Sequence, residues 1–420
     1  MMLLPMAVRS LASRRASVLL TVFTLALSTA LLLGIEHIRE QSRAGFFNTV
    51  SGTDLIVGAR SGPVQLLLYS VFHVGSATSN IRWPSYTQLR DDPRVAWTIP
   101  LSLGDSHRGY RVIGTDNAMF EHYRYGEGQG LALAEGDQLD DLFAVVLGAE
   151  VARALDYQLG DELIIAHGTG NTSFKLHDNM PFYVSGILQP TGTPLDRAVL
   201  VTLEGLEAVH IGWRAGIALP GMQATPDQAR QRDLTPRQVT AALVGLNSRM
   251  QVFHLQRELN SQRQDPLTAV MPGVALQELW QVVSLAERAL LAVSSVALLI
   301  GLSGMLAVLL SGMQQRRHEV AVLRALGASP LRISTLLLLE SLLLTLVGFL
   351  LGLALLWGGL YLLQQPLLEQ FGLHLTVVTR LSTQQWQLAG FIVGLGALGG
   401  LIPAFMAYRM ALVKSLGQRH

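Results

Sequence analysis

The chain has 420 residues, of which 50% are hydrophobic and 15% are charged. Ordinary soluble domains carry roughly 25% charged residues, so this composition excludes a disordered chain and indicates long apolar segments. Because the chain has no cysteine, thiol catalysis, iron–sulfur clusters, thiolate metal sites and a disulfide scaffold are excluded. The net charge of +1 is uninformative by itself, since basic and acidic residues lie in different parts of the chain.

Four apolar runs are long enough to cross a membrane. The first follows three arginines and has no small-x-small cleavage site at its end, so we expect an uncleaved span rather than a signal peptide. With its flanking apolar residues, each run reaches the roughly 20 residues that cross about 30 Å of hydrocarbon. The runs are Leu19–Gly34, Ala289–Met313, Ile333–Leu363 and Leu388–Ala407.

Basic residues are concentrated in three short segments. Segments 1–17, 313–332 and 409–420 together hold ten basic residues and one acidic residue, whereas segment 35–284 holds 19 basic and 26 acidic residues. Short loops rich in Arg and Lys stay on the cytoplasmic side of a membrane. We therefore expect both termini and the 313–332 loop to be cytoplasmic and segment 35–284 to lie outside.

The outer segment has the pattern of a folded α+β domain. Short apolar runs bounded by Gly, Asp and Pro predict strands, and helical spacing of apolar residues predicts helices. The predicted strands are 54–58, 110–114, 144–147, 162–166, 182–188 and 198–202. The predicted helices are 150–159 and 203–211. A proline-containing stretch, 214–240, is expected to join two lobes, the second beginning with a strand at 241–246 and a helix near 255–262.

A long helix is expected to lead into the second span. Leu276, Leu279, Val283, Ala286 and Leu290 recur at steps of three and four residues, which predicts a continuous helix with a seam for a partner helix. An extension of the first span over residues 35–47 is the candidate partner.

The predicted fold is thus a membrane protein of four transmembrane α-helices with a large α+β extracytoplasmic domain inserted between the first and the second. The expected layout is a cytoplasmic amphipathic segment and first span (1–34), the periplasmic domain with helical stalks (35–284), the second span (285–313), a cytoplasmic helix (314–330), the third span (331–363), a short outer loop (364–386), the fourth span (387–408) and a cytoplasmic tail (409–420).

Motifs for catalysis are absent from the sequence. Only two lysines occur, Lys175 and Lys414, and neither follows a glycine, so the chain lacks the lysine of a phosphate-binding loop. His318-Glu319 is followed by Val322 where a zinc protease needs its second histidine, and there is no Gly-x-Ser-x-Gly nucleophile elbow. We therefore predict no enzymatic activity, no catalytic residues and no cofactor bound by this chain.

Two features of the outer segment keep alternatives open. His167, His177 and Asp178 are weak candidates for a zinc site, because imidazoles and a carboxylate suit zinc. They lack the spacing of a known site, however, and hydrogen-bonded or solvated histidines are the favoured interpretation. The apolar run 65–72 is interpreted as domain core, with a surface for an apolar substrate, a lipid or a partner protein as the alternative.

The cytoplasmic loop has the pattern of two helices that meet at a corner. Val320, Leu323 and Leu326 recur at steps of three residues, and Gly327 is a natural helix C-cap. Ser329 and Pro330 suit the N-cap and first position of the next helix. The loop is interpreted either as an ordinary basic loop or as a docking helix for a cytoplasmic partner.

This loop, RRHEVAVLRALGASPLRISTLLLLES, resembles the signature of the FtsX/MacB/LolC–LolE permease superfamily, the mechanotransmission or type VII ABC transporters. The start, AVRSLASRRASVLLTVFTLALS, and the end, PAFMAYRMALVKSL, are similar to the same family. The resemblance implies a pair of permease subunits, this chain with a second copy or a homologous permease, and a separate cytoplasmic ABC ATPase dimer that binds ATP and Mg²⁺. It places the complex in a bacterial inner membrane.

By this resemblance, the coupling helix for the ATPase is 316–327. The residues implied in ATPase coupling are Arg316, Arg317, Glu319, Leu323, Arg324 and Gly327. The outer domain then moves a periplasmic or membrane-derived substrate, with a periplasmic adaptor, substrate-binding protein or lipoprotein as an open further partner and no nucleic acid. The alternatives are a non-transporting signal relay that activates a periplasmic enzyme and, less favoured, a secondary transporter. The substrate is not predicted.

Two features of the spans carry further predictions. Small residues at helical spacing let backbones approach closely. We therefore expect helix packing, within or between permease subunits, at Ser341, Thr345, Gly348, Gly352, Gly390 and Gly394. Glu340 is a carboxylate inside a span, and such groups usually face the bundle interior with a partner. A structural role for Glu340 is favoured over gating and over proton coupling.

Overall fold

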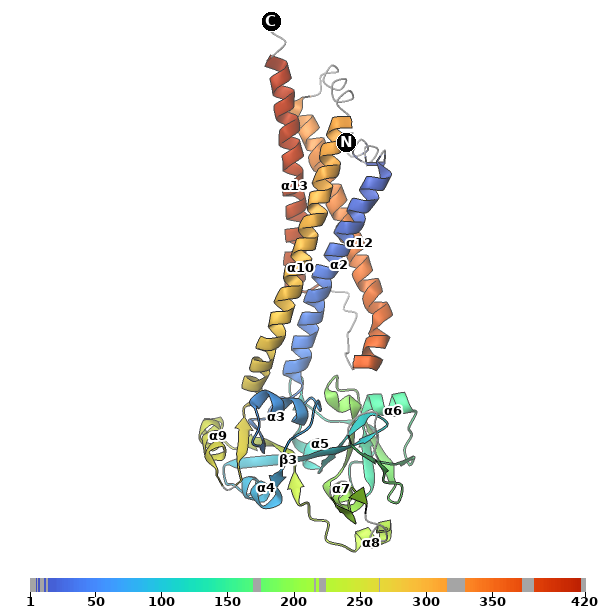
Figure 1. Ribbon diagram of the computed structural model, residues 1–420, viewed down its shortest axis with the longest axis vertical. Helices are drawn as coiled ribbons and strands as arrows, with labels where there is room; N and C mark the ends of the chain where they lie inside the picture. Colours follow the sequence, from blue (N-terminus) through green and yellow to red (C-terminus); the bar gives the residue numbers. More distant parts are fainter. Residues whose placement is uncertain are drawn as a thin grey trace. The chain divides into compact units, whose positions relative to one another are not determined.

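The computed structural model describes residues 5, 7, 11–12, 14–168, 175–214, 217–218, 224–263, 265–315, 329–371 and 381–416. The chain divides into two compact units. The helical unit comprises Met1–Ser42 and Val283–His420, and the α/β unit comprises Arg43–Val282. Long helices make up the first unit, and a sheet with short helices makes up the second (Figure 1).

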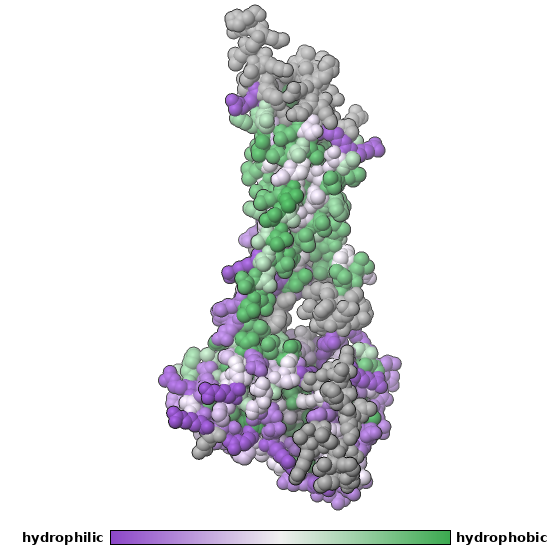
Figure 2. Space-filling view, viewed as in Figure 1, coloured by the Kyte–Doolittle hydropathy of each residue, from purple (hydrophilic) through white to green (hydrophobic). Residues whose placement is uncertain are grey.

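Among the residues that the structure describes, four helices are long and apolar enough to cross a membrane, as predicted. They are α2 (Arg15–Asn48), α10 (Pro272–Gln315), α12 (Pro330–Phe371) and α13 (Thr383–Leu416). The candidate spans within them are Arg15–Gln41, Pro272–Gly312, Leu331–Gln364 and Thr383–Met406. Apolar residues dominate the visible surface of these helices, whereas hydrophilic residues are spread over the α/β unit (Figure 2).

The helical unit has a core to which all four helices contribute. Leu25 of α2, Leu298 of α10, Leu344 of α12 and Ile392 of α13 are almost completely buried in one cluster. Helices α12 and α13 pack against each other along much of their length. This core explains why the apolar runs form a bundle rather than four independent helices.

The predicted continuity of the helices around the α/β insertion is confirmed. Helix α10 runs without a break for 44 residues, and α2 runs for 34 residues. The predicted seam on α10 is wrong in its second half, because Ala286 and Leu290 are exposed. In the part of the chain that the structure describes, a polar contact joins the two helices here instead: Arg39 Nε lies 3.4 Å from Glu287 Oε2.

The α/β unit is built on one mixed sheet of 12 strands. The central path has the order β18-β1-β17-β3-β4-β13-β8-β12-β7, with β9, β10 and β11 paired to its side. Its strands are β1 (Leu55–Ala59), β3 (Val95–His107), β4 (Tyr110–Thr115), β7 (Leu133–Gly136), β8 (Ala144–Leu147), β9 (Glu162–Leu163), β10 (Ala166–His167), β11 (Lys175–Leu176), β12 (Phe182–Leu188), β13 (Ala198–Thr202), β17 (Ala241–Leu246) and β18 (Leu267–Val270).

Short strands and helices complete the unit. Three two-stranded sheets pair β2 (Ile81–Arg82) with β16 (Gln238–Val239), β5 (Arg124–Tyr125) with β6 (Gln129–Gly130), and β14 (Trp213–Arg214) with β15 (Ile217–Ala218). The helices are α3 (Pro63–Ser70), α4 (Trp83–Arg90), α5 (Ala118–His122), α6 (Ala149–Leu155), α7 (Leu203–Val209), α8 (Pro226–Arg230) and α9 (Val252–Ser261), with 3₁₀ turns η1 (Pro194–Arg197) and η2 (Arg249–Gln251).

Two consecutive lobes, predicted to meet near 214–240, are not what the structure shows. Strand β17, which follows that stretch, pairs with β1 on one side and with β3 on the other. The end of the inserted segment therefore completes the sheet that its beginning starts. The physical reason is that the apolar strand β17 buries all but its last residue by insertion between two strands that are distant in sequence.

The apolar run 65–72 belongs to the core, as the favoured interpretation predicted. It forms most of α3, in which Leu66, Leu67 and Tyr69 are buried. Gly58 of β1 makes the close approach possible, because a Cβ there would lie 2.5 Å from Leu66 Cδ1 and 2.6 Å from the Tyr69 hydroxyl.

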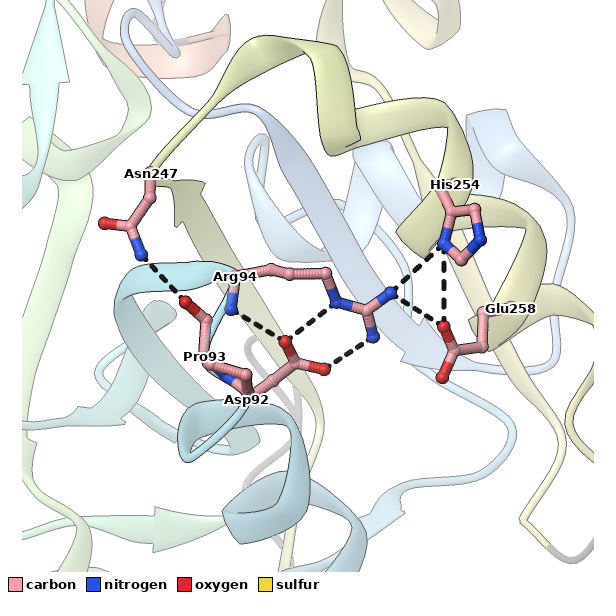
Figure 3. Close-up of polar contacts among 6 residues, drawn as sticks. All are labelled: Asp92, Pro93, Arg94, Asn247, His254 and Glu258. Carbon is pink, nitrogen blue, oxygen red and sulfur yellow. Dashed lines mark hydrogen bonds and ion pairs between the residues drawn. The ribbon is translucent and has the colours of Figure 1, made fainter.

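A polar network ties the start of β3 to α9 (Figure 3). Arg94 donates hydrogen bonds to Asp92 from Nε at 2.9 Å and from Nη2 at 2.6 Å, and to Glu258 of α9 at 2.8 Å. Asn247 adds a bond of 3.0 Å to the Pro93 carbonyl. The guanidinium thus bridges carboxylates that are 166 positions apart in the chain.

Candidate functional site

The predicted ATPase-coupling residues lie outside the described residues: Arg316, Arg317, Glu319, Leu323, Arg324 and Gly327. The helices on either side of them are described. Helix α10 ends at Gln315, and α12 begins at Pro330, the position that the sequence pattern assigns to the first residue of the new helix. Ser329, just before it, is exposed, and its carbonyl accepts a hydrogen bond of 3.0 Å from the backbone N–H of Arg332 in the first turn.

Small residues of α12 allow close contact with α2. A Cβ at Gly348 would lie 2.7 Å from Leu25 Cβ, and one at Gly352 would lie 2.6 Å from the Ala26 carbonyl oxygen. No side chain larger than hydrogen fits at either position without moving α2. These two glycines therefore lie at a helix contact within this chain.

The contact between α12 and α13 uses hydroxyl side chains set against glycines. Ser341 and Thr345 are buried and face Gly400 and Gly396, where a Cβ would lie 1.9 Å and 2.1 Å from the hydroxyl oxygens. Ser334 donates a hydrogen bond of 2.9 Å to the Ala404 carbonyl of α13. The hydroxyls of Ser341 and Thr345 donate within α12 instead, each at 2.9 Å to a carbonyl three or four residues earlier.

Gly390 and Gly394 lie outside this contact between α12 and α13. Their predicted role in helix packing stays a prediction for a contact between subunits. Nothing in the described residues lies within 4 Å of a Cβ built at either glycine. The reason is helical phase: Gly390 precedes Gly396 by six residues, as Gly394 precedes Gly400, which turns them by about 120° around the helix.

Glu340 is buried in the helical unit, with 1% of its surface exposed. Its Oε2 lies 4.0 Å from Arg14 Nη2, within ion-pair distance, and Arg14 Nη1 donates a bond of 2.9 Å to the Val308 carbonyl of α10. Gly312 leaves room for this guanidinium, which occupies the space that a Cβ would take. The contact joins α10, α12 and the residue before α2.

A second group of functional side chains lies in the α/β unit. Asp105, His167, His177 and His210, called here the histidine cluster, each offer a ligand atom, and these atoms all lie within 4.8 Å of one another. The strand ladder places three of them. Asp105 of β3 pairs directly with His167 of β10, and His177, just after β11, bonds through its backbone N–H to the Ile165 carbonyl at 2.9 Å.

The fourth member comes from a helix end. His210 caps α7, and its Nδ1 lies 2.7 Å from the Leu206 carbonyl oxygen. A carbonyl only accepts, so Nδ1 carries the proton and Nε2 faces the cluster. This Nε2 lies 3.3 Å from His167 Nδ1 and 3.7 Å from Asp105 Oδ2.

The two buried members of the cluster, Asp105 and His177, have side-chain atoms without hydrogen bonds. His177 is fully buried, and neither of its ring nitrogens has a hydrogen-bond partner among the described residues; the same is true of Asp105 Oδ2. Each buried polar atom without a partner costs about 1–3 kcal/mol. Trp213 packs on the His177 ring, with centroids 4.5 Å apart. Burial lowers the pKa of His177 to about 4, and the hydrogen bond that His167 donates to the Asp105 carboxylate raises the pKa of His167.

Two of the three weak metal candidates therefore come together, and one does not. His167 and His177 are members of the cluster, whereas Asp178 is exposed in the turn after β11. The turn keeps the Asp178 side chain at the surface, whereas His177 is buried. Among the other outer histidines, His107 is held by the Ile164 carbonyl at 2.7 Å and the Tyr157 hydroxyl at 3.0 Å.

Comparison with known families decides what kind of protein carries these features. The family described as MacB-like periplasmic core domain matches residues 18–259, more than half of the chain, and the family described as FtsX-like permease C-terminal matches residues 291–412. The chain belongs to the FtsX/MacB-type ABC permeases. It is therefore an ABC-type transmembrane subunit and a multi-pass membrane protein.

Comparisons with individual proteins add little to the assignment of this chain as an FtsX/MacB-type permease. No curated protein matches the chain. Among solved structures, the crystal structure of the periplasmic region of MacB from Actinobacillus actinomycetemcomitans is similar, at 13% sequence identity and a TM-score of 0.34, over 58% of this chain and 97% of that chain.

Proposed function

We propose that this permease couples a separate cytoplasmic ABC ATPase dimer to motion of its core domain in a bacterial inner membrane. The observation that carries the proposal is a pair of unbroken helices, α2 and α10, which precede and follow the α/β unit (called the core domain below) in the chain. At 1.5 Å per residue, the 44 residues of α10 extend over roughly 66 Å, about twice the hydrocarbon thickness. A helix of this kind carries a displacement at one end to the other.

The orientation follows from charge. Segments 1–17, 313–332 and 409–420 are strongly basic, which favours both termini and the 313–332 loop on the cytoplasmic side. The core domain then lies in the periplasm. ATP and Mg²⁺ are bound by the ATPase, since the sequence of this chain has no phosphate-binding loop.

The proposed output is mechanical. Closure of the ATPase on ATP moves the coupling helix 316–327, the spans tilt, and the core domain changes shape to export or extract a periplasmic or membrane-derived substrate. The permease works with a second copy or a homologous subunit. A bound periplasmic enzyme in place of a transported substrate would favour a signal relay.

Affinity purification from native membranes tests the proposal. We expect an ABC ATPase to be isolated with the wild-type chain and its hydrolysis rate to respond to the permease. The pair Leu323→Asp and Arg324→Glu in the coupling segment should abolish both effects while membrane insertion persists. A matched control, Arg380→Glu in the opposite loop, should change neither. Normal ATPase binding and stimulation by the double variant would contradict the assignment.

A further inference from the structure

We propose that Asp105, His167, His177 and His210 form a binding site for a divalent transition-metal ion of the zinc class. The site does not rest on the proposed function, because a metal would bind whether or not an ATPase drives the helices. Three imidazoles and one carboxylate form a set of four ligands, which is the number that zinc takes in a tetrahedral site.

The distances fit such an ion after small side-chain rotations. Ligands about 2.0–2.1 Å from a tetrahedral metal lie about 3.3 Å from one another. The ring nitrogens His210 Nε2 and His167 Nδ1 are already 3.3 Å apart, His167 Nδ1 is 3.0 Å from Asp105 Oδ1, and all four ligand atoms lie within 4.8 Å.

The orphaned atoms of the cluster point to a ligand. A fully buried imidazole with no hydrogen bond at either nitrogen is uncommon, and here it lies beside a buried carboxylate oxygen that also has no hydrogen-bond partner among the described residues. A metal ion at their centre would satisfy both. The ring of Trp213 excludes solvent on the side of His177.

A backbone carbonyl also orients one of the proposed ligands, His210. Metal-binding histidines usually donate their second ring N–H to a carbonyl or carboxylate, which fixes the tautomer. The bond between His210 Nδ1 and the Leu206 carbonyl does this and turns Nε2 toward the cluster. The side chains of His167 and His210 are 37% and 29% exposed, so the ion enters from their side.

The donor set argues against other ions. Calcium and magnesium take oxygen ligands, and one carboxylate among three imidazoles does not serve them. Zinc, cobalt, nickel and copper accept imidazole. Because its ligands come from β3, β10, the end of β11 and α7, the bound ion would cross-link four elements of the α/β unit.

The test uses the full-length chain in detergent, with an affinity tag that contains no histidine. Metal is removed with a chelator, Zn²⁺ is added back, and binding is measured by competition with a chromophoric chelator and by elemental analysis. We expect one tightly held Zn²⁺ per chain and a rise in the unfolding temperature with zinc but not with magnesium. Cobalt should give the strong visible bands of a four-coordinate ion.

Variants locate the site. His177→Ala and Asp105→Asn should each lower the affinity by more than about 100-fold, beyond the 10–100-fold typical of changes to groups that orient a ligand. His254→Ala, an exposed histidine of α9 outside the cluster, should bind zinc normally. If His177→Ala fails to fold, the partly exposed His210→Ala decides instead. Absence of stoichiometric zinc in the wild type, or its retention in the cluster variants, would overturn the proposal.

Discussion

Gly352 of α12 faces the backbone of Ala26 on α2 so closely that a Cβ would lie 2.6 Å from the Ala26 carbonyl oxygen. On the next turn of α2, Thr29 Cβ would lie 2.7 Å from the same added Cβ. The neighbouring atom on this side is backbone, which cannot rotate away as a side chain can. The first and third candidate spans are therefore held together at a point that tolerates only glycine.

Gly352→Leu should separate α12 from α2. Overpacking a filled site costs about 1–3 kcal/mol and more where backbone must move, so we expect a clearly lower unfolding temperature of the purified chain. The matched control is Gly390→Leu, at a glycine that has no described neighbour within 4 Å. Equal unfolding temperatures for the two variants would show that the contact does not hold the bundle together.

Glu340 and Arg14 should behave as an energetically coupled pair. Their side chains are 2% and 14% exposed, and removal of one partner from a buried ion pair costs about 3–5 kcal/mol. We expect Glu340→Ala and Arg14→Ala each to destabilise the chain, and the double variant to lose less than the two single losses combined. A double-mutant cycle of unfolding free energies measures this. Strict additivity would assign the two residues independent roles.

The partly buried carboxyl of Asp116 should make the stability of the α/β unit depend on pH. Burial raises the pKa of Asp116 to about 6 from the model-peptide value of 3.8. The folded state therefore binds more protons than the unfolded state between these values, and stability falls as pH rises through that window. Above this pH window, the charged carboxylate lowers the free energy of unfolding by at most about 3 kcal/mol.

Asp116→Asn isolates this effect, since the amide oxygen can still accept the hydrogen bond that Asp116 takes from Ala118 N at 3.1 Å. We expect the variant to unfold at a higher temperature than the wild type at pH 7 and at a similar temperature near pH 4. Thermal unfolding followed by circular dichroism at the two pH values gives the comparison. A stability gain that is the same at both pH values would contradict the explanation.

The Arg94 network in Figure 3 should contribute unequally through its two carboxylates. Asp92 is mostly buried, with 18% of its side chain exposed, whereas Glu258 is 56% exposed. Exposed pairs contribute about 0–1 kcal/mol. We therefore expect Asp92→Asn to lower the unfolding free energy more than Glu258→Gln does, as measured by denaturant titration. A larger loss for Glu258→Gln would place the main contact on the α9 side.

Local pattern predicted most of the fold, and long-range pairing accounts for the rest. The four spans and strands such as β8 and β12 are marked by their own residues. Strand β3, the longest, was missed because Pro100 and Gly104 interrupt its apolar pattern. It forms because β17 and β4 pair with it on either side, a stabilisation that no window of local sequence contains. The same pairing removes the predicted division into lobes.

The histidine cluster shows the same division between local and long-range information. His167 and His177 were candidates because imidazoles suit zinc, but Asp105 and His210 lie far from them in sequence. Only the ladder of β3, β10 and β11, together with the end of α7, brings the four side chains to one point. Without an alignment between strands, no spacing rule identifies the carboxylate as Asp105 rather than the adjacent Asp178.

The most direct test of the coupling account is the side of the membrane on which each part of the chain lies. The chain has no cysteine, so a single introduced thiol reports its own position. We would label Ser329→Cys, next to the coupling segment, and Met250→Cys, at an 89% exposed position of the α/β unit, with a reagent that does not cross the inner membrane. The account predicts that Met250→Cys reacts in intact spheroplasts and that Ser329→Cys reacts only after the membrane is opened. Reaction of Ser329→Cys in intact spheroplasts would place the coupling segment away from ATP and contradict the account.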